Sequence, residues 1–304
     1  MDSLLSRVGR GQVLLADGAI GSLLMARGLP GGQAPESINL AHPEVLEEIA
    51  RLYLEAGADI VQTNTFGASP LKLAAYGLDG QTDAINEKAV QAVRRAIGDK
   101  AFVSASCGPS GRILKPYGDT DAGELFDSFR AQMKALVNAG VDMICIETMS
   151  DLGEARLAVE AARSVDRALP VAATMTFEAT ARGFFTIMGV TIEKACRELA
   201  TAGADLVGSN CGNGSRLMVA IAREFRKFTA LPLLIQANAG VPELRDGVVR
   251  YPETPEFMAA TVPELIAAGS AVIGGCCGTT PDHTRAMRRA VDGELQKRHG
   301  GNAE

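Results

Sequence analysis

The sequence contains no tryptophan, and only 5% of its residues are aromatic. This scarcity argues against an aromatic cage for onium ligands and against a base-stacking surface. Positive charge is not concentrated either: the net charge is −6, and no run of basic residues occurs. A nucleic-acid partner is therefore not expected.

Long hydrophobic runs are also missing. No apolar stretch approaches the about 18 residues needed to cross a membrane, and residues 1–11 lack the apolar core of a signal peptide. The sequence therefore predicts a cytoplasmic protein without a membrane partner. In that setting the six cysteines are expected to be free thiols or metal ligands rather than a disulfide framework.

What is present fits one large α/β domain. Hydrophobic residues make up 47% of 304 residues, and the 33 glycines suit a fold with many tight turns. Short, nearly continuous apolar runs are typical of parallel strands that are buried on both faces. Eight such runs are predicted as strands, at residues 13–17, 59–65, 102–106, 143–148, 171–177, 206–211, 233–238 and 271–276.

Helical patterns separate these runs. Apolar residues recur at three- and four-residue spacing over residues 44–57, 125–137 and 192–199, which predicts amphipathic helices. Thr-Pro-Glu at 254–256 is typical of a helix start, with threonine as N-cap and proline in the first turn.

An internal repeat supports the strand count. Ala-Gly-x-Asp occurs at residues 56–59, 139–142 and 202–205, and a weaker copy lies at 268–271. Each copy ends a helix and opens predicted strand two, four, six or eight, so the chain reads as βαβ units. We therefore predict a single TIM-type (β/α)8 barrel domain over residues 1–304, with elaborated βα loops at 28–39, 108–119 and 240–255. A doubly wound open sheet is the alternative.

Active sites of such barrels lie at the C-terminal ends of the strands. Strands six and eight end in Cys211 and in the pair Cys276 and Cys277. Thiolates suit zinc, and three protein ligands leave the fourth tetrahedral position open, as in a catalytic site. Because strand eight neighbours strand one in a closed barrel, Asp17 is expected near this cysteine pair.

The remaining cysteines, Cys107, Cys145 and Cys196, are interpreted as small buried hydrophobic residues. The spacing of the three cysteines at strand ends matches no zinc-ribbon pattern. Their position on the barrel rim, and not their spacing in the sequence, therefore favours a metal site.

Four segments resemble the homocysteine S-methyltransferase family, in order and along essentially the whole chain. They are Ala-Asp-Gly-Ala-Ile-Gly-Ser at 16–22, Gly-Ala-Asp-Ile-Val-Gln-Thr-Asn-Thr-Phe-Gly-Ala at 57–68, Asn-Cys-Gly at 210–212 and Gly-Gly-Cys-Cys-Gly-Thr-Thr-Pro at 274–281. The second segment looks closest to the homocysteine module of cobalamin-dependent methionine synthase. The resemblance implies a zinc-dependent enzyme that methylates the thiol of homocysteine to give methionine.

By the same resemblance, Cys211, Cys276 and Cys277 carry over as the zinc ligands, through which catalysis would occur.

Asp17 and Glu147 carry over as contacts to the amino group of homocysteine, and Gly18 and Asn210 are further predicted substrate contacts. Residues of these types also have structural roles. Asp17 could cap a turn, and Glu147 could pair with a neighbour inside the barrel. Asn210, like Asn64 and Asn238, could bind the substrate carboxylate or tie loops together.

The methyl donor is left open. Gly278 resembles cobalamin-dependent and betaine-using relatives more than the branch that uses S-methylmethionine. No Asp-x-His-x-x-Gly corrinoid motif is present, and the histidines are His42, His283 and His299. A methyl-corrinoid would therefore have to arrive on a separate protein.

Three alternatives to homocysteine methylation also stay open. One is a corrinoid-linked methyl-transfer or demethylation component that acts on another methylated substrate or small thiol. A second is a non-catalytic zinc or vicinal-thiol redox protein. A phosphate-binding barrel is the third. A homo-oligomer is expected from the family resemblance alone.

Overall fold

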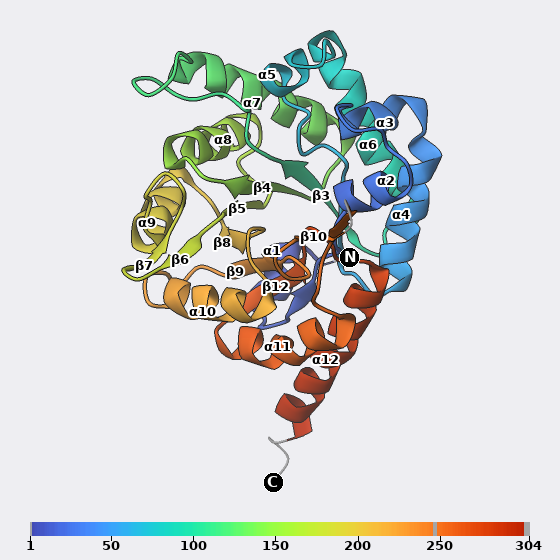
Figure 1. The fold of residues 1–304 in the computed structure, drawn as a ribbon, viewed down its shortest axis with the longest axis vertical. Coiled ribbons are helices and arrows are strands. Elements are labelled where there is room, and N and C mark those ends of the chain that lie inside the picture. The colour runs from blue at the N-terminus through green and yellow to red at the C-terminus, as the bar shows by residue number, and fades with distance from the viewer. Residues whose placement is uncertain (1, 246–247, 301–304) are drawn as a thin grey trace.

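The computed structural model describes residues 2–245 and 248–300. Its centre is a sheet of eight parallel strands (Figure 1). In spatial order the strands are β1 (Leu14–Leu15), β12 (Ser270–Gly275), β9 (Leu233–Ala237), β8 (Leu206–Asn210), β5 (Val171–Met175), β4 (Met143–Met149), β3 (Phe102–Cys107) and β2 (Ile60–Gln62). These are the eight predicted runs, and the predicted TIM-type barrel is confirmed.

The barrel closes between its first two strands. Ala16 forms a parallel bridge with Ile60. The backbone N–H of Asp17 donates to the carbonyl of Ile60 at 3.0 Å, and that of Asp59 donates to the carbonyl of Leu15 at 2.7 Å. The first two strands are shorter than predicted. The second ends at Gln62 because the chain turns there into the βα loop, where the Thr65 N–H donates to the carbonyl of Thr63.

Eight helices surround the strands, one after each (Figure 1). They are α4 (Pro43–Glu55), α6 (Thr82–Ile97), α7 (Ala122–Ala139), α8 (Leu152–Val165), α9 (Ile192–Ala202), α10 (Ser215–Arg226), α11 (Pro255–Ala267) and α12 (Pro281–Gly300). The three predicted apolar stripes fall on α4, α7 and α9, and Thr254 accepts a hydrogen bond from the Phe257 N–H as the predicted N-cap of α11.

The Ala-Gly-x-Asp repeat fixes the bottom of the barrel. In its first three copies the aspartate accepts a hydrogen bond from a backbone N–H of the preceding barrel strand and pairs with an arginine. The pairs are Asp59 with Leu15 N and Arg288, Asp142 with Val103 N and Arg94, and Asp205 with Val171 N and Arg163. In the fourth copy Ala271 takes the place of the aspartate.

A short N-terminal helix, α1 (Leu4–Gly9), closes the same end. Its Leu4 and Val8 join an apolar cluster of inward-facing strand residues, among them Leu14, Leu206 and Val272. The lower barrel interior is therefore a packed core, and it leaves the opposite end for a site.

That opposite end carries the elaborate connections. The loop after β1 holds α2 (Gly21–Ala26), the 3-10 turn η1 (Pro35–Ser37) and α3 (Ile38–Ala41). The loop after β2 holds α5 (Pro70–Ala74) and a second 3-10 turn, η2 (Asp79–Gln81). Two hairpins that the sequence did not indicate follow β5 and β9: β6 (Glu178–Thr180) with β7 (Gly183–Phe185), and β10 (Glu243–Arg245) with β11 (Val248–Arg250).

Within the described ranges, no helix is both long enough and apolar enough to cross a membrane.

Candidate metal centre and its pocket

The three predicted cysteines meet at the C-terminal rim. Cys211 follows β8, and Cys276 and Cys277 follow β12. The Sγ atoms of Cys211 and Cys277 lie 3.8 Å apart, and all three sulfurs lie within 4.8 Å of one another. Among the described residues this is the only group of three or more histidine, cysteine or acidic side chains with such spacing.

The strand between them holds both cysteine loops. β9 lies between β8 and β12, and its carbonyls at Gln236 and Ala237 accept hydrogen bonds from the N–H groups of Cys211 and Cys276 at 3.1 and 2.7 Å. Cys211 has a φ of +60°, a left-handed conformation that non-glycine residues seldom adopt. This backbone strain directs its side chain toward the other two cysteines, and such outliers are concentrated at functional sites.

Negative charge collects on these sulfurs. Hydrogen bonds from the thiols of Cys276 and Cys277 lower the pKa of Cys211 to about 3. The same contacts raise the pKa of Cys276 well above its usual value and that of Cys277 to about 11. In this arrangement one thiolate accepts hydrogen bonds from two thiols. A metal cation can take the place of the two thiol protons, so that all three sulfurs become thiolate ligands.

The sulfur spacing fits a metal ion. Metal–sulfur bonds of about 2.3 Å at a tetrahedral centre place sulfurs about 3.8 Å apart. The distance from Cys211 to Cys277 equals this value without any rearrangement. The chain thus supplies three soft ligands on one side of a metal position.

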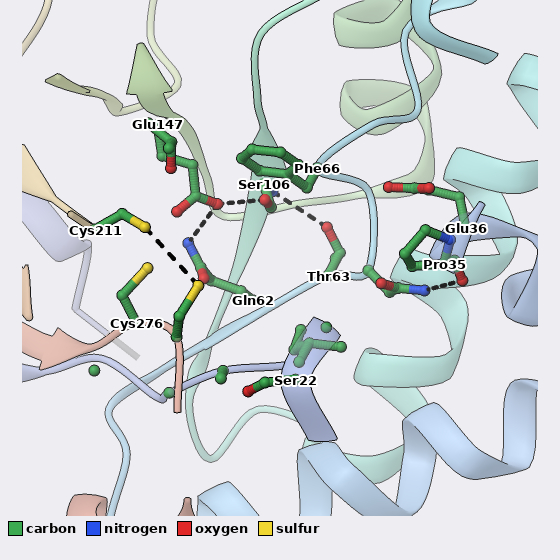
Figure 2. Close-up of a pocket in the computed structure, with 18 residues that line it drawn as sticks. Ser22, Pro35, Glu36, Gln62, Thr63, Phe66, Ser106, Glu147, Cys211 and Cys276 are labelled. Atoms are coloured by element: carbon green, nitrogen blue, oxygen red, sulfur yellow. Dashed lines mark hydrogen bonds between the residues drawn. The ribbon is translucent and has the colours of Figure 1, made fainter. Parts of the chain in front are cut away.

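The fourth side of this position faces a cavity of about 220 Å³. Figure 2 shows Cys211 and Cys276 on one side, with Glu147 on that same side, and Pro35 and Glu36 on the other. The lining residues are Gly18, Ala19, Ile20, Gly21, Ser22, Pro35, Glu36, Gln62, Thr63, Asn64, Phe66, Ser106, Glu147, Thr148, Cys211, Gly275, Cys276 and Cys277.

Glu147, near the end of β4, is one of the two acidic residues that line this cavity, and Glu36 is the other. Its Oε1 accepts hydrogen bonds from the Ser106 hydroxyl and, at 3.3 Å, from the Gln62 amide (Figure 2). Burial raises the pKa of Glu147 to about 7, although both hydrogen bonds oppose the shift. Glu147 therefore pairs with neighbours inside the barrel and also lines the cavity, and its contact with a substrate stays a prediction.

Asn210 does not line the cavity but contacts Glu147, which does. Its Nδ2 lies 3.3 Å from Glu147 Oε2 and 3.9 Å from Cys276 Sγ. Its Oδ1 accepts hydrogen bonds from the Thr148 N–H and the Thr174 hydroxyl, each at 2.7 Å. One amide therefore fixes the carboxylate relative to the sulfur cluster.

Asp17 and Gly18 occupy different surroundings although they are consecutive. Asp17 is fully buried outside the cavity lining, and its Oδ2 accepts a hydrogen bond from the Gln62 N–H at 2.8 Å. Burial raises the pKa of Asp17 to about 8. Gly18 does line the cavity, and a Cβ there would lie 2.5 Å from Thr279 Oγ1, so only glycine fits.

The other singled-out residues are structural or peripheral. Cys107, Cys145 and Cys196 are buried, as predicted. Asn64 donates to the Pro35 carbonyl and to Asn39 Oδ1, so it ties two loops together while also lining the cavity. The Asn238 side chain is one of the groups that lower the pKa of Cys211.

Sequence reasoning missed Gln62 and Ser106, which hold Glu147. A signal was present, because Gln62 lies two positions after the inward-facing Ile60 and Ser106 lies four positions after the inward-facing Phe102, so each falls on the inner face of its strand. The glycine-rich loops near strands six and eight do not offer a free anion site at their helix starts. The Glu253 carboxylate accepts from the Ser215 N–H at the start of α10, and His283 Nδ1 accepts from the Thr280 N–H at the start of α12.

Comparison with known proteins places these features in a family. The family model described as homocysteine S-methyltransferase matches residues 14–291. The metallated form of the homocysteine methyltransferase MmuM from Escherichia coli superposes with a TM-score of 0.78 at 24% identity, covering 94% of this chain and 99% of that one. Its oxidized form gives 0.76 at 25% identity, with 94% and 98% covered.

Longer relatives match as well. Methionine synthase from Mycobacterium tuberculosis is 33% identical over 299 residues, which is 92% of this chain and 25% of that protein. Methionine synthase from Mycobacterium leprae is 32% identical, with 92% and 24% covered. The chain thus spans about a quarter of the length of these relatives.

Proposed function

The chain belongs to the homocysteine S-methyltransferase family, and from this membership we propose that it transfers a methyl group to the thiol of homocysteine, giving methionine. The observation that carries the proposal is the cluster of Cys211, Cys276 and Cys277 at the end of a cavity that also contains a buried carboxylate, Glu147.

We propose zinc as the metal and these three cysteines as its ligands. Three thiolates favour zinc over oxygen-preferring cations such as Mg²⁺ or Ca²⁺. The similarity to a metallated methyltransferase structure supports a metal in this family. Bound zinc would hold the sulfur of homocysteine as the thiolate, which is the nucleophilic form of a thiol.

Glu147 is proposed to bind the substrate ammonium. This carboxylate lies close to the sulfur cluster, because the Asn210 amide lies within 3.9 Å of both groups. An ammonium at Glu147 and a sulfur at the cluster would orient homocysteine along the cavity. Gly18 lines the cavity with its backbone, while Asn210 and Asp17 lie outside the cavity lining and act on it through their neighbours.

The transfer itself requires few protein groups. The substrate sulfur supplies the electron pair of the new S–CH₃ bond, and the donor keeps the pair of the bond that breaks. Because the thiol proton is lost on binding, no protein base is needed during the transfer. The chain's contribution is to position the sulfur and keep it electron-rich.

For the donor we propose a methyl-corrinoid carried on a protein segment outside the barrel. Phe66 is the only aromatic residue among those that line the described cavity, so no cage for a sulfonium or quaternary ammonium exists there. Apolar side chains are also exposed around the rim, including Met25, Tyr117 and Leu244, as at protein-binding surfaces. The relatives named methionine synthase are about four times as long as this chain.

The first experiment measures bound zinc in the purified protein and in Cys211→Ser and Cys276→Ser, with Cys196→Ser as a buried-cysteine control. The samples are then titrated with homocysteine while zinc–sulfur coordination is followed by X-ray absorption. We expect about one zinc per chain in the wild type and the control, its loss in both cluster variants, and one additional sulfur ligand with homocysteine.

The outcomes separate the alternatives. A reduced wild type that binds no supplied zinc would refute the metal centre and favour the vicinal-thiol redox function. Bound zinc whose sulfur coordination does not change when homocysteine is added would favour a corrinoid-linked component that acts on another thiol. For the donor, methyl transfer from free methylcobalamin but not from S-methylmethionine is expected, and the reverse preference would refute the corrinoid proposal.

A further inference from the structure

A short segment at residues 251–253 contacts the surroundings of both cysteine loops. It leaves the β10–β11 hairpin and enters α11, and it is named here the bridging segment. Its Glu253 N–H donates to the Ala239 carbonyl at 2.9 Å, while the Ala239 N–H donates to the Cys277 carbonyl at 3.0 Å. The bridging segment is therefore one hydrogen-bonded residue away from the metal centre.

Tyr251 makes the direct contact. Its side chain lies close enough to Cys277 for each group to affect the pKa of the other. Its ring lies on the backbone of Gly278, where a Cβ would be only 2.0 Å from Tyr251 Cγ. Gly278 also has a φ of +79°. Glycine is therefore required at this position both for the left-handed turn and for the close approach of the Tyr251 ring.

Glu253 holds the other side. Its Oε2 accepts hydrogen bonds from the Ser215 N–H at 2.9 Å and the Ser215 hydroxyl at 2.7 Å, which fixes the start of the helix that follows Cys211. Its backbone carbonyl lies 3.0 Å from His283 Nε2 on the helix that follows Cys277. Because the Thr280 N–H donates to His283 Nδ1, Nε2 carries the proton and donates to Glu253.

These hydrogen bonds and packing contacts could fix the orientation of the Cys211 and Cys277 side chains. Cys211 and Cys277 come from strands that are separated by β9, and Cys211 is held in a strained conformation. The strand pairing brings both cysteine loops to one rim, and the bridging segment adds contacts to Ser215 after Cys211 and to Gly278 after Cys277. We propose that the bridging segment is a positioning element of the metal centre, in which Tyr251 holds and tunes the Cys277 thiolate while Glu253 fixes the loop that carries Cys211.

The proposal rests on the metal centre of the proposed function and adds residues outside its ligand set. A phenol O–H that donates to a thiolate withdraws charge from the sulfur, so it sets how strongly that sulfur donates to a metal. Partners of this kind fix ligand orientation and alter metal affinity when removed. Because the bridging segment continues from the hairpin, contacts on β10–β11 would reach the metal centre through Tyr251.

The test compares Tyr251→Phe with Tyr117→Phe, a matched change on an exposed tyrosine of another rim loop. Each protein is loaded with cobalt(II), and zinc affinity is measured by chelator competition. Loss of the hydroxyl should move the sulfur-to-cobalt charge-transfer band to longer wavelength, because the Cys277 sulfur becomes more electron-rich. It should also weaken zinc binding about tenfold, because the lost orientation of this ligand outweighs its stronger donation. Tyr117→Phe should change neither property. An unshifted band with unchanged zinc affinity in Tyr251→Phe would overturn the role of Tyr251.

Glu253→Gln, compared with Glu256→Gln at the exposed first turn of α11, tests the second contact. Because Glu253 touches no sulfur, the variant should bind zinc more weakly without moving the band. Unchanged zinc affinity would overturn the role of Glu253. Failure of the wild type to bind zinc or cobalt would instead refute the proposed function, so the two failures are distinguishable.

Discussion

Cys211 and Cys277 bring their sulfurs to 3.8 Å although an entire strand, β9, separates the strands from which they come. The spacing already equals that of two thiolates on one tetrahedral metal ion. This pair of sulfurs is therefore already at the distance that two ligands of one metal ion would need, and all three sulfurs lie within 4.8 Å of one another.

Metal should stabilise the folded chain in proportion to its affinity. A ligand that binds only the folded state at 1,000 times its Kd adds about 4 kcal/mol. We expect the Tm measured by calorimetry to rise when zinc is added to protein stripped by a chelator. In Cys276→Ser this rise should vanish, whereas Cys196→Ser should keep it despite a lower starting Tm. An equal rise in all three proteins would show that zinc binds elsewhere.

Glu147→Gln tests ammonium binding by the buried carboxylate. The pKa of Glu147 is raised to about 7, so the free protein loses the ionised form as pH falls below that value. The KM for homocysteine in the wild type should therefore increase below about pH 7. In Glu147→Gln it should be raised about tenfold to hundredfold at higher pH, equivalent to the about 1.5–3 kcal/mol of a charged hydrogen bond, and this acidic limb should disappear.

Steady-state kinetics from roughly pH 5.5 to 8.5, in steps of roughly half a pH unit, would test the rise of KM at low pH in the wild type and its loss in Glu147→Gln. Glu154→Gln is the matched control, because Glu154 is also buried but bonds Ser110 outside the cavity lining. An acidic limb that persists in Glu147→Gln would assign the titration to another group.

The barrel and the sulfur cluster could be predicted because both depend on periodic features. Parallel strands buried on both faces give continuous apolar runs, and strand ends in a closed barrel meet on one rim. Cys211 and the pair Cys276 and Cys277 are thus brought together by topology alone. No detail of side-chain packing was needed for that prediction.

Asp17 shows where such reasoning stops. Side chains alternate along a strand, and Leu14 and Ala16 face the barrel interior. Asp17 accordingly lies on the side of α4, against Leu46, Ile49 and Tyr53, and outside the cavity. Tyr251 was equally out of reach, because its contact with Cys277 depends on a loop path that no periodicity encodes.

Asp17→Asn should alter the pH dependence of stability. Asp17 has an ordinary pKa of 3.8, and burial raises it to about 8 in the folded protein. Between these values the folded state retains a proton that the unfolded state has lost, so stability falls as pH rises, by at most about 1.4 kcal/mol per unit. Asparagine can still accept the Gln62 N–H hydrogen bond and carries no such proton.

Urea unfolding at several pH values from 5 to 8, in steps of roughly one unit, checks this by comparing the two slopes. We expect the difference in the free energy of unfolding between Asp17→Asn and the wild type to grow in favour of the variant as pH increases. A constant difference across the series would mean that Asp17 is ionised in the folded protein throughout.

Ala271→Asp should restore the missing member of the aspartate repeat. Arg226 lies beside Gly269, as Arg163 lies beside Gly203 in the preceding copy, and its buried Nε has no hydrogen-bond partner. An aspartate at 271 would supply a carboxylate for Arg226 and for a backbone N–H at the start of β9. We expect the free energy of unfolding to increase by about 1 kcal/mol, the net value of such a hydrogen bond.

The control is a double-mutant cycle with Arg226→Met, analysed by urea unfolding near neutral pH. The gain from Ala271→Asp should be lost in the Arg226→Met background, because an unpaired carboxylate near the bottom of the barrel adds no stability. Asp205→Ala gives the opposite comparison in a complete copy, where both the Arg163 and the Val171 N–H contacts disappear. An equal gain in stability with and without Arg226 would show that the introduced carboxylate acts only on the backbone N–H of β9. No gain in either background would show that a carboxylate at position 271 cannot reach these two partners.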